Sequence, residues 1–391
     1  MSATHMLLAA SAAQAGVSFM VLGLPSIGPQ LRSEFDLSLA GLGALLAAMQ
    51  LGSGIALVGA GRAVDRLGAR TATRLGTSLA VVGLVLAALV HAAPAVFLGL
   101  MIAGVGAAII PVSGAGAIFR VYPGRRRAWA LGVRQTAVPV GGLIAAVLVP
   151  ALEAADGIRL VLAAGAVAVG VLGMVFSSVS DDVQTRHPRS VGLFRGIWDQ
   201  PGIRRLLVVT VTYLFLLQTI LSYTVPAMRA AGFSAVQAGV GYFVINATAI
   251  ISRLAWGRIA DGADGTRRKR SLVETGLMAA ASALLFGLAL HSSLPFVLVA
   301  LALYSFAALG WNAVVYALAG EWTTPQLAGR AFAASATVVF VGTAVVGPVI
   351  GAIADWVGWD GLYGIAAGVA LLGAAVSQLL PDAVAGSAPT P

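Results

Sequence analysis

Two arginines lie inside long apolar stretches of this chain, where a charge is unfavourable. Arg134 opens the run RQTAVPVGG together with Gln135, and Arg253 lies four residues before Gly257. An arginine at the centre of a membrane span costs about 2.5 kcal/mol on insertion scales, and it usually faces a cavity that marks a transport path. Its planar guanidinium can bind a carboxylate or a phosphate through two hydrogen bonds. The pair therefore predicts a binding site for a small anion within the membrane.

No acidic residue lies deep enough in these apolar runs to neutralise both arginines. The 15 Asp and Glu residues all fall between the runs or at their edges, and the most interior of them is Glu274. Because an uncompensated buried charge is destabilising, a bound substrate anion would stabilise the pair. The alternative is that each arginine extends along its helix and places its charge at the cytoplasmic surface.

Polar and aromatic side chains recur at helical spacing in the same runs. Tyr242, Asn246 and Arg253 are spaced i, i+4 and i+11, which places them on one face of a helix. The alternative for such stripes is interhelical hydrogen bonding, which contributes about 0.6 kcal/mol for each bond on average. We predict instead that the polar and aromatic set lines a substrate cavity with the two arginines. Its members are Gln14, Gln135, Gln218, Tyr242, Asn246, Tyr304, Trp311 and Asn312.

Twelve apolar runs must position these side chains. A helix that crosses a hydrocarbon core of about 30 Å needs about 20 apolar residues, and each run has about this length. The chain is therefore predicted to be an all-α integral membrane protein with twelve transmembrane helices. The predicted spans are 6–28, 39–60, 72–91, 94–118, 129–151, 158–177, 205–227, 236–257, 271–291, 294–318, 328–352 and 360–380.

The composition excludes most other classes of protein. Hydrophobic residues make up 59% of the 391 residues and charged residues only 10%, against about 25% charged in soluble domains. The chain has no cysteine, and its four histidines show no metal-binding spacing, so disulfides and a metal site are not expected. Because no nucleophile–base pair or phosphate loop is evident either, we expect no enzyme activity and no cofactor.

The distribution of basic residues predicts the orientation in the membrane. If both termini are cytoplasmic, 19 of the 24 Lys and Arg residues fall in cytoplasmic loops, and only Arg32, Arg159 and Arg229 fall in outer loops. Cytoplasmic loops normally carry this excess, so we predict a multi-pass protein of the cytoplasmic (inner) membrane with both termini inside. The same distribution accounts for the net charge of +9 without a nucleic-acid partner.

The chain is built from two related halves. The loop GRAVDRLGAR, Gly61 to Arg70, has a degenerate copy that starts at Gly257, and Asp65 and Asp261 lie 196 residues apart. Tandem halves are typical of secondary transporters. We predict an N-terminal six-helix bundle over 1–178, a cytoplasmic loop over 179–204, a C-terminal six-helix bundle over 205–381 and a disordered tail over 382–391.

With these spans, the loop resembles the signature loop of the major facilitator superfamily. The positions that carry the resemblance are Gly61, Asp65, Arg66, Gly68 and Arg70, with Gly257 and Asp261 in the second copy. The resemblance implies two six-helix bundles that rock around a central cavity and open it to each side in turn. It also implies that Asp65 and nearby arginines latch the cytoplasmic ends together. A carboxylate at a helix end can pair with an arginine and a helix N-terminus, and both contacts break when the bundles part. The alternative is that the loop only staples its own half and sets the topology.

The site pattern is most similar to the organic-anion and monocarboxylate members of that family. Several of them carry an arginine four residues before the glycine that opens the second loop, where Arg253 stands here. Two departures weaken a drug–proton antiport assignment. Leu100 stands where many proton-coupled members carry an arginine before Gly104, and the fifth span lacks the glycine usually found before Pro139.

These features favour a secondary transporter of a small solute, in particular an organic anion such as a carboxylate, moved by alternating access. The mode is exchange, or symport in which a proton accompanies the substrate, so protons are one candidate coupling ion. The expected partners are this small-molecule substrate and membrane lipid, and the expected state is a monomer. The alternative is proton-coupled efflux of amphipathic drugs or metabolites. A non-transporting receptor is a third reading, against which the signature loop argues.

Overall fold

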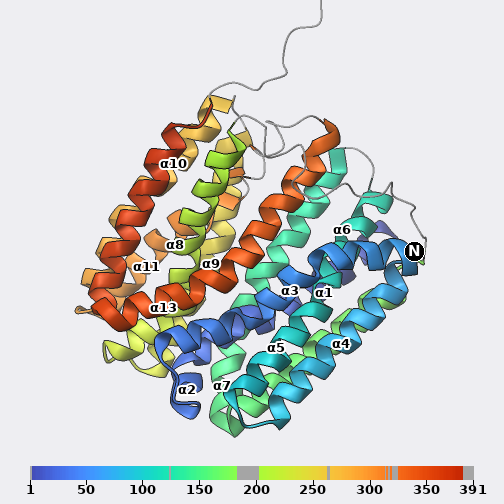
Figure 1. The fold of residues 1–391 in the computed structure, drawn as a ribbon, viewed down its shortest axis with the longest axis horizontal. Coiled ribbons are helices and arrows are strands. Elements are labelled where there is room, and N and C mark those ends of the chain that lie inside the picture. Colours follow the sequence, from blue (N-terminus) through green and yellow to red (C-terminus); the bar gives the residue numbers. More distant parts are fainter. Residues whose placement is uncertain are drawn as a thin grey trace, which may run out of the picture.

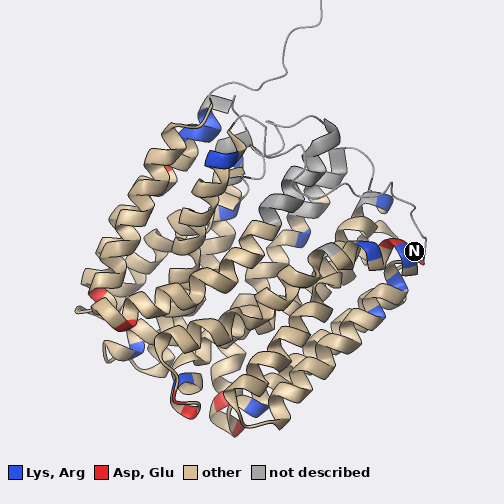
Figure 2. Ribbon diagram, viewed as in Figure 1, with Lys and Arg blue, Asp and Glu red and all other residues tan. Residues whose placement is uncertain are grey.

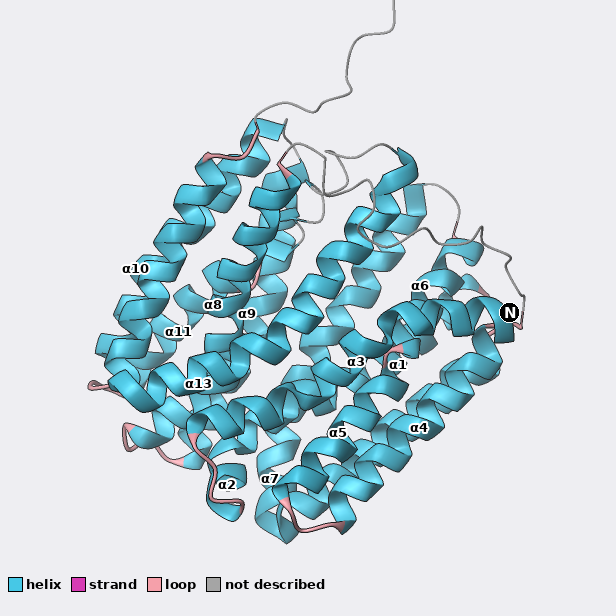
Figure 3. Cartoon of the chain, viewed as in Figure 1, coloured by secondary structure: helices cyan, strands magenta, loops and turns pink. Residues whose placement is uncertain are grey.

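The computed structural model describes residues 2–122, 125–182, 202–261, 265–312, 314–315, 318 and 325–381. Within these ranges the regular structure is helical and contains no strand (Figure 3), which confirms the predicted all-α class. Residues 183–201 of the central loop predicted over 179–204, the tail over 382–391 and part of the tenth span lie outside the described residues.

The helices form a bundle of long rods (Figure 1). Their order along the chain is α1 (Ala3–Gly23), the 3-10 helix η1 (Leu24–Ile27), α2 (Gly28–Glu34), α3 (Leu39–Leu67), α4 (Ala69–Leu89), α5 (Ala93–Ala107), α6 (Ile109–Val121), α7 (Arg125–Val179), α8 (Ile203–Ala230), α9 (Ala235–Asp261), α10 (Gly265–Ala289), α11 (Leu294–Ala308) and α13 (Pro325–Gln378).

The helices account for the twelve predicted spans. Nine described stretches are long and apolar enough to cross a membrane, and the shorter apolar helix α11 adds another. Two of the nine, in α7 and α13, each contain a break in the backbone. The breaks lie at Gly157 (φ 65°) and Gly358 (φ 72°), in a region of backbone geometry that favours glycine. Each of these two helices is therefore a pair of spans joined by a sharp turn.

Three predicted spans are not single straight helices. The first does not stop at residue 28, because η1 begins at Leu24 with Pro25 and α2 then continues to Glu34. The fourth is divided at Ala108 into α5 and α6. In the tenth, α11 ends at Ala308. These local changes in helix geometry leave no gap in hydrophobicity, so the apolar runs did not reveal them.

Two helix pairs make the most extensive contacts between the predicted halves, and η1 and α2 add smaller contacts with α8 and α9. Within the first half α1 packs on α7, and α4 packs on α5 and α7; within the second half α8 and α10 pack on α13, and α9 packs on α11. The joining pairs are α3 with α13 and α7 with α9, and Figure 1 shows α3 and α13 crossing near the front of the bundle. The borders at 178 and 205 stay predictions.

Charged residues gather at the two ends of the bundle (Figure 2). One end holds the α3–α4 connection with Arg66 and Arg70 and the start of α8 with Arg204. The opposite end holds the α2–α3 connection with Glu34 and Asp36. We call the latter the outer end, following the predicted orientation, which itself stays a prediction.

Candidate transport path

Arg134 is a buried cation with one neutral side-chain partner. It lies in the first span of α7 and is 6% exposed. Its Nη1 donates to Gln14 Oε1 of α1 at 3.1 Å. Across from it, Gly114 of α6 leaves room, since an added Cβ would lie 3.5 Å from the Arg134 side chain. Among the described residues no carboxylate pairs with Arg134, and its Nε has no hydrogen-bond partner. The site is therefore positively charged and retains an unused donor.

Arg253 reaches from α9 to the backbone beside Arg134. Its Nη1 donates to the carbonyl oxygen of Gln135 at 3.4 Å. Arg253 of α9 thus contacts the short segment of α7 that carries Arg134. Gln135 makes this contact through its carbonyl group, and its side chain is exposed. One residue along a helix turns the side-chain direction by about 100°, so burial of Arg134 turns Gln135 away. An exposed side chain can face an open cavity, so the prediction that Gln135 lines one stays a prediction.

Asn246 lies two helical turns from Arg253, on the same line of contact between α9 and α7, which we call the α7–α9 seam. It is 1% exposed, and its Nδ2 donates to the Tyr242 carbonyl oxygen at 3.0 Å. A Cβ added to Gly142 of α7 would overlap Asn246 Oδ1. Asn246 and Arg253 are seven residues apart, as are Gly142 and Gln135, so the two contacts belong to one antiparallel register. The predicted polar face of α9 therefore packs against α7 and joins the halves.

The remaining predicted residues of the second half are buried, except Asn312, which is half-buried. Tyr304 of α11 lies edge-on to Tyr363 at 6.4 Å between ring centroids, and Trp311 lies 5.9 Å from Tyr213. Within the described part of the chain, the Tyr242 and Tyr304 hydroxyls, the Trp311 Nε1 and the Asn312 Oδ1 are buried without a hydrogen-bond partner. Gln218 of α8 is buried as well. The role of Gln218, Tyr304, Trp311 and Asn312 in a cavity with the two arginines stays a prediction.

Sequence reasoning missed a seal between α3 and α13 at the outer end. The Asp355 carboxylate of α13 accepts from Leu39 N at 3.3 Å and from Ala40 N at 3.2 Å, the first two residues of α3. Those N–H groups have no partner within their own helix, and the positive end of the helix dipole favours an anion there. Asp355 therefore binds the start of a helix from the other half.

Tyr223 of α8 completes the seal. Its hydroxyl donates to the Gly347 carbonyl oxygen at 2.6 Å, with the Leu39 carbonyl oxygen at 3.2 Å. Added Cβ atoms on Gly43 or Gly351 would overlap the opposite helix. Small residues allow membrane helices to approach closely, and the spacing Gly347-x-x-x-Gly351 is the sequence signal that could have located this contact.

The signature loop joins the start of α4 to the residues that follow α7, so its contacts lie within one half. Gly68 has a φ of 83°, and an added Cβ would lie 2.6 Å from Asp182 Cα, just beyond the end of α7. Asp182 accepts from the backbone N–H of Thr71 at 3.0 Å and from its hydroxyl at 3.2 Å, while Arg70 Nε donates to the Ser180 carbonyl oxygen at 2.8 Å. The Thr71 N–H bond, together with the nearby Arg70 charge, holds the pKa of Asp182 below its usual range.

The predicted latch between the cytoplasmic ends stays a prediction. Asp65 is half-buried in the last turn of α3, next to exposed Arg66, and Gly61 has open space at its Cα. The side chains at the start of α13 and the surroundings of Gly257 and Asp261 lie outside the described residues.

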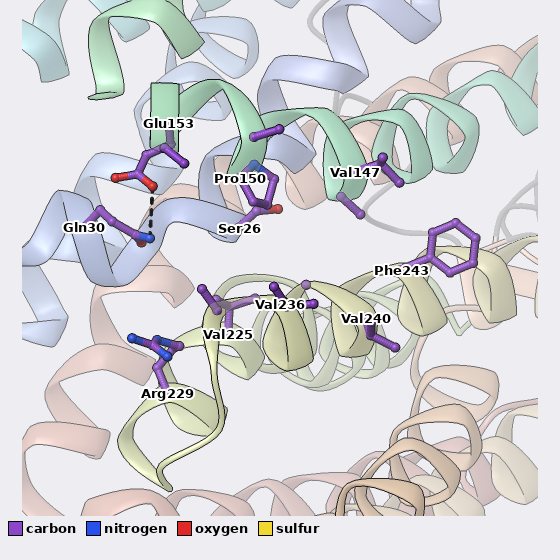
Figure 4. A pocket seen from close by; sticks show the side chains of 15 residues that line it. Ser26, Gln30, Val147, Pro150, Glu153, Val225, Arg229, Val236, Val240 and Phe243 are labelled. Atoms are coloured by element: carbon purple, nitrogen blue, oxygen red, sulfur yellow. Dashed lines mark hydrogen bonds between the residues drawn. The ribbon is translucent and has the colours of Figure 1, made fainter. Parts of the chain in front are cut away.

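A cavity of about 620 Å³ opens on a different part of the α7–α9 seam (Figure 4). It lies toward the outer end, between η1, α2, the first span of α7, the end of α8 and the start of α9. None of the ten predicted substrate-binding residues lines it. The arginine site and this cavity are therefore separate features.

Comparison with known proteins identifies the family. The family model described as Major Facilitator Superfamily matches residues 7–310 and 263–389. An uncharacterized MFS-type transporter of Mycobacterium tuberculosis (strain CDC 1551 / Oshkosh) is 27% identical over 330 residues, which is 81% of this chain and 70% of the relative. A second uncharacterized MFS-type transporter, from Mycobacterium tuberculosis strain H37Rv, is 26% identical over 285 residues, 70% of this chain and 60% of the relative's length.

Solved structures share the fold at low sequence identity. A D-xylose-proton symporter superposes with a TM-score of 0.82 at 17% identity, covering 98% of this chain and 99% of that chain. A bacterial homolog of the human lysosomal transporter Spinster, inward-facing and occupied, gives 0.80 at 16% identity over 96% of each chain. The family match, the twelve spans and these likenesses agree. The chain therefore belongs to the major facilitator superfamily, whose members are transporters and not enzymes.

Proposed function

We propose that this multi-pass transporter carries a small organic anion, such as a carboxylate, and that Arg134 is its main ligand. The observation that supports this most is the environment of the Arg134 guanidinium, which is buried, contacts a neutral amide and keeps an unused Nε donor. A bound carboxylate would neutralise the buried charge and accept from the planar donor fork.

Arg253 would couple anion binding to movement of the halves. Its guanidinium already contacts the α7 backbone at Gln135, directly beside Arg134. An anion held by Arg134 would compete with the Gln135 carbonyl for Arg253 and draw α9 toward α7. Because a ligand shifts a conformational equilibrium only by binding one state better, this bridge would favour the state in which both arginines face the anion.

The proposed transport mode is exchange, or symport in which a proton travels with the substrate. Leu100 stands where many proton-coupled members of the family carry an arginine. The sequence also has no carboxylate deep within a span that could relay a proton. Under this proposal the protein works as a monomer in the cytoplasmic membrane, with both termini inside.

A second candidate function is efflux of amphipathic compounds. The observation that favours it is the apolar wall of the 620 Å³ cavity, with exposed Val147, Val240 and Phe243. Like-charge repulsion at Arg134 argues against cationic drugs as substrates. Neutral or anionic amphiphiles would fit both features.

Ligand-induced thermal stabilisation of the purified full-length protein tests the proposal. The panel holds mono- and dicarboxylates, phosphate esters, inorganic anions, neutral sugars and cationic amphiphiles. A ligand at 100 times its dissociation constant stabilises the folded state by about 2.7 kcal/mol. We expect a carboxylate to raise the Tm of the wild type, Arg134→Ala to abolish that rise, and Arg134→Lys to retain part of it.

Arg159→Ala is the matched control, because Arg159 is exposed near the outer end. This substitution should leave the rise in Tm caused by the carboxylate unchanged. If no anion shifts the melt while neutral or cationic amphiphiles do, and Arg134→Ala preserves their effect, the anion proposal fails and amphiphile efflux becomes the better account.

A further inference from the structure

The cavity on the α7–α9 seam opens at the surface of apolar spans. Several of its wall residues are accessible at the protein surface: Val147 is 61% exposed, Val236 76% and Phe243 43%. These residues belong to apolar spans, and a side chain of a span that faces outward from the bundle is surrounded by lipid. Figure 4 shows Val147 on one wall, with Val236, Val240 and Phe243 on the opposite wall.

The apolar part of the cavity has the depth of a lipid chain segment. From Glu153 to Ala146 along α7 is seven residues, or about 10 Å at 1.5 Å per residue. The facing wall from Ala235 to Phe243 on α9 is eight residues, or about 12 Å by the same rise. Gly239 keeps this wall open, because an added Cβ would meet only the Ala146 carbonyl oxygen at 3.8 Å.

The other end of the cavity is polar and carries its two charged side chains, Glu153 and Arg229. Gln30 Nε2 donates to Glu153 Oε2 at 3.4 Å (Figure 4), and Arg229 Nη1 donates to the Phe233 carbonyl oxygen at 2.7 Å. Among the described residues, Gln30 Oε1 and the hydroxyl of Ser26, which is 7% exposed, are buried without a hydrogen-bond partner. Three of these groups, including the Glu153 carboxylate, can accept hydrogen bonds.

These charged groups lie at the depth of lipid headgroups. Glu153 is three residues before the break in α7 at Asp156, and Arg229 is one residue before the end of α8. Both positions mark the outer ends of their spans, where the hydrocarbon core meets the interface. The polar end of the cavity is thus level with headgroups, and its apolar part is level with acyl chains.

We propose that this cavity is a binding site for a glycerophospholipid with a primary ammonium headgroup, taken from the outer leaflet. One acyl chain lies in the apolar part beside Gly239. The ammonium donates to Glu153 and to Gln30 Oε1, and the phosphate pairs with Arg229. An anionic lipid without an ammonium would satisfy Arg229 but leave Glu153 and the Gln30 acceptor opposite negative or apolar groups, so the site discriminates by headgroup.

Occupancy of this site would act on the transport cycle. The lipid contacts α7 and α9, which belong to opposite halves and meet again at Gly142 and Asn246 deeper in the same seam. Bound lipid therefore stabilises the arrangement of halves seen in this structure. The proposal does not rest on the identity of the transported solute.

The test uses purified full-length protein in detergent with phosphatidylethanolamine or phosphatidylglycerol of identical acyl chains. Native mass spectrometry counts retained lipids, and thermal melts report stabilisation. For the wild type we expect a retained phosphatidylethanolamine adduct and a larger rise in Tm than phosphatidylglycerol gives. Gly239→Leu fills the cavity and should lose both effects. Glu153→Gln should reduce the phosphatidylethanolamine effect to the phosphatidylglycerol level.

Gly368→Leu is the matched control, because Gly368 is an exposed glycine in a span and, like Gly239, has room for an added Cβ. It should retain the adduct and the preference. A lipid-free Tm of Gly239→Leu equal to that of the wild type shows that the variant is folded. The proposal is overturned if Gly239→Leu keeps the adduct, if Gly368→Leu loses it equally, or if Glu153→Gln keeps the full headgroup preference.

Discussion

Several polar residues in this protein satisfy backbone groups of another helix. Asp182 binds the N–H of Thr71, Asp355 binds the N–H groups at the start of α3, and Ser252 and Trp256 both donate to the Phe306 carbonyl oxygen at 2.7 and 3.1 Å. Phe306 lies two residues before the end of α11. In a membrane an unpaired backbone group has no water to bind, so these side chains allow helices to begin or end where they do.

The Asp182 contact predicts a pH-dependent stability. Its pKa is lowered in the folded protein, first by the Thr71 N–H bond, so its contribution is present above the unfolded pKa and is lost as the pH falls through the folded pKa. We expect Asp182→Asn to lower the Tm at neutral pH and the difference from the wild type to shrink in acid. Thermal melts over a descending pH series measure this. Asp181→Asn, at an exposed neighbour, should change the Tm little at any pH; a deficit of Asp182→Asn that persists unchanged in acid would contradict the assignment.

The α7–α9 seam is the element that connects both proposed sites. It holds the Arg253 contact at one end, Asn246 against Gly142 in the middle and the lipid cavity toward the outer end. Antiparallel packing brings these positions into one line although α7 and α9 are about 100 residues apart in sequence.

Gly142→Ala tests the packing of this seam. The added methyl overlaps Asn246 Oδ1 and lies 2.9 Å from Leu22 Cδ1, so we expect destabilisation of about 1–3 kcal/mol, as for overpacked cores. The double variant Gly142→Ala/Asn246→Ala should recover part of the loss because it removes the overlapping amide. Gly364→Ala, where a Cβ meets nothing within 4 Å, should melt like the wild type. Equal Tm values for Gly142→Ala and Gly364→Ala would show that the seam is looser than described.

Much of the helical layout was predictable from sequence, because membrane spans are continuous apolar runs. The burial of Arg134 was also predictable, since a charge inside such a run has few environments open to it. The direction of the neighbouring Gln135 side chain was not, because one residue of helical rotation turns a side chain by about 100°. Asp355 and Tyr223 were missed for a different reason: their roles depend on which helix start and which carbonyl group lie opposite, and that is decided by long-range packing.

At the scale of the whole molecule, the two halves are held together at the outer end. Asp355, Tyr223 and the close approach of Gly43 to Gly347 all join α3 to helices of the second half. In a transporter that opens alternately to each side, these contacts must break when the outer side opens. The structure therefore has its outer end closed.

Removing the Asp355 contact should shift this conformational equilibrium. Loss of a carboxylate from a helix N-terminus costs about 1 kcal/mol, and about 1 kcal/mol corresponds to roughly a five-fold change in a two-state population. The chain has no cysteine, so a cysteine placed at buried Leu42 of α3 reports opening through its labelling rate with an impermeant maleimide. We expect Asp355→Ala to raise that rate by about this factor and Tyr223→Phe to raise it less.

Asp360→Ala serves as the comparison for this experiment, because Asp360 is an exposed acid at the same end that pairs with His291 at 2.9 Å and not with α3. It should leave the labelling rate unchanged. An unchanged rate in Asp355→Ala as well would mean that the glycine contact alone keeps the outer end closed.

The outer seal consists largely of main-chain atoms. The N–H groups of Leu39 and Ala40 and the carbonyl oxygens of Leu39 and Gly347 supply most of its partners. Replacing most side chains along α3 and α13 would therefore leave the seal intact, while substitutions at Arg134 or Gln14 would alter recognition without touching it. Divergent sequences can thus acquire new substrate preferences while keeping the same outer seal. Substrate selectivity and turnover can therefore be engineered as separate properties.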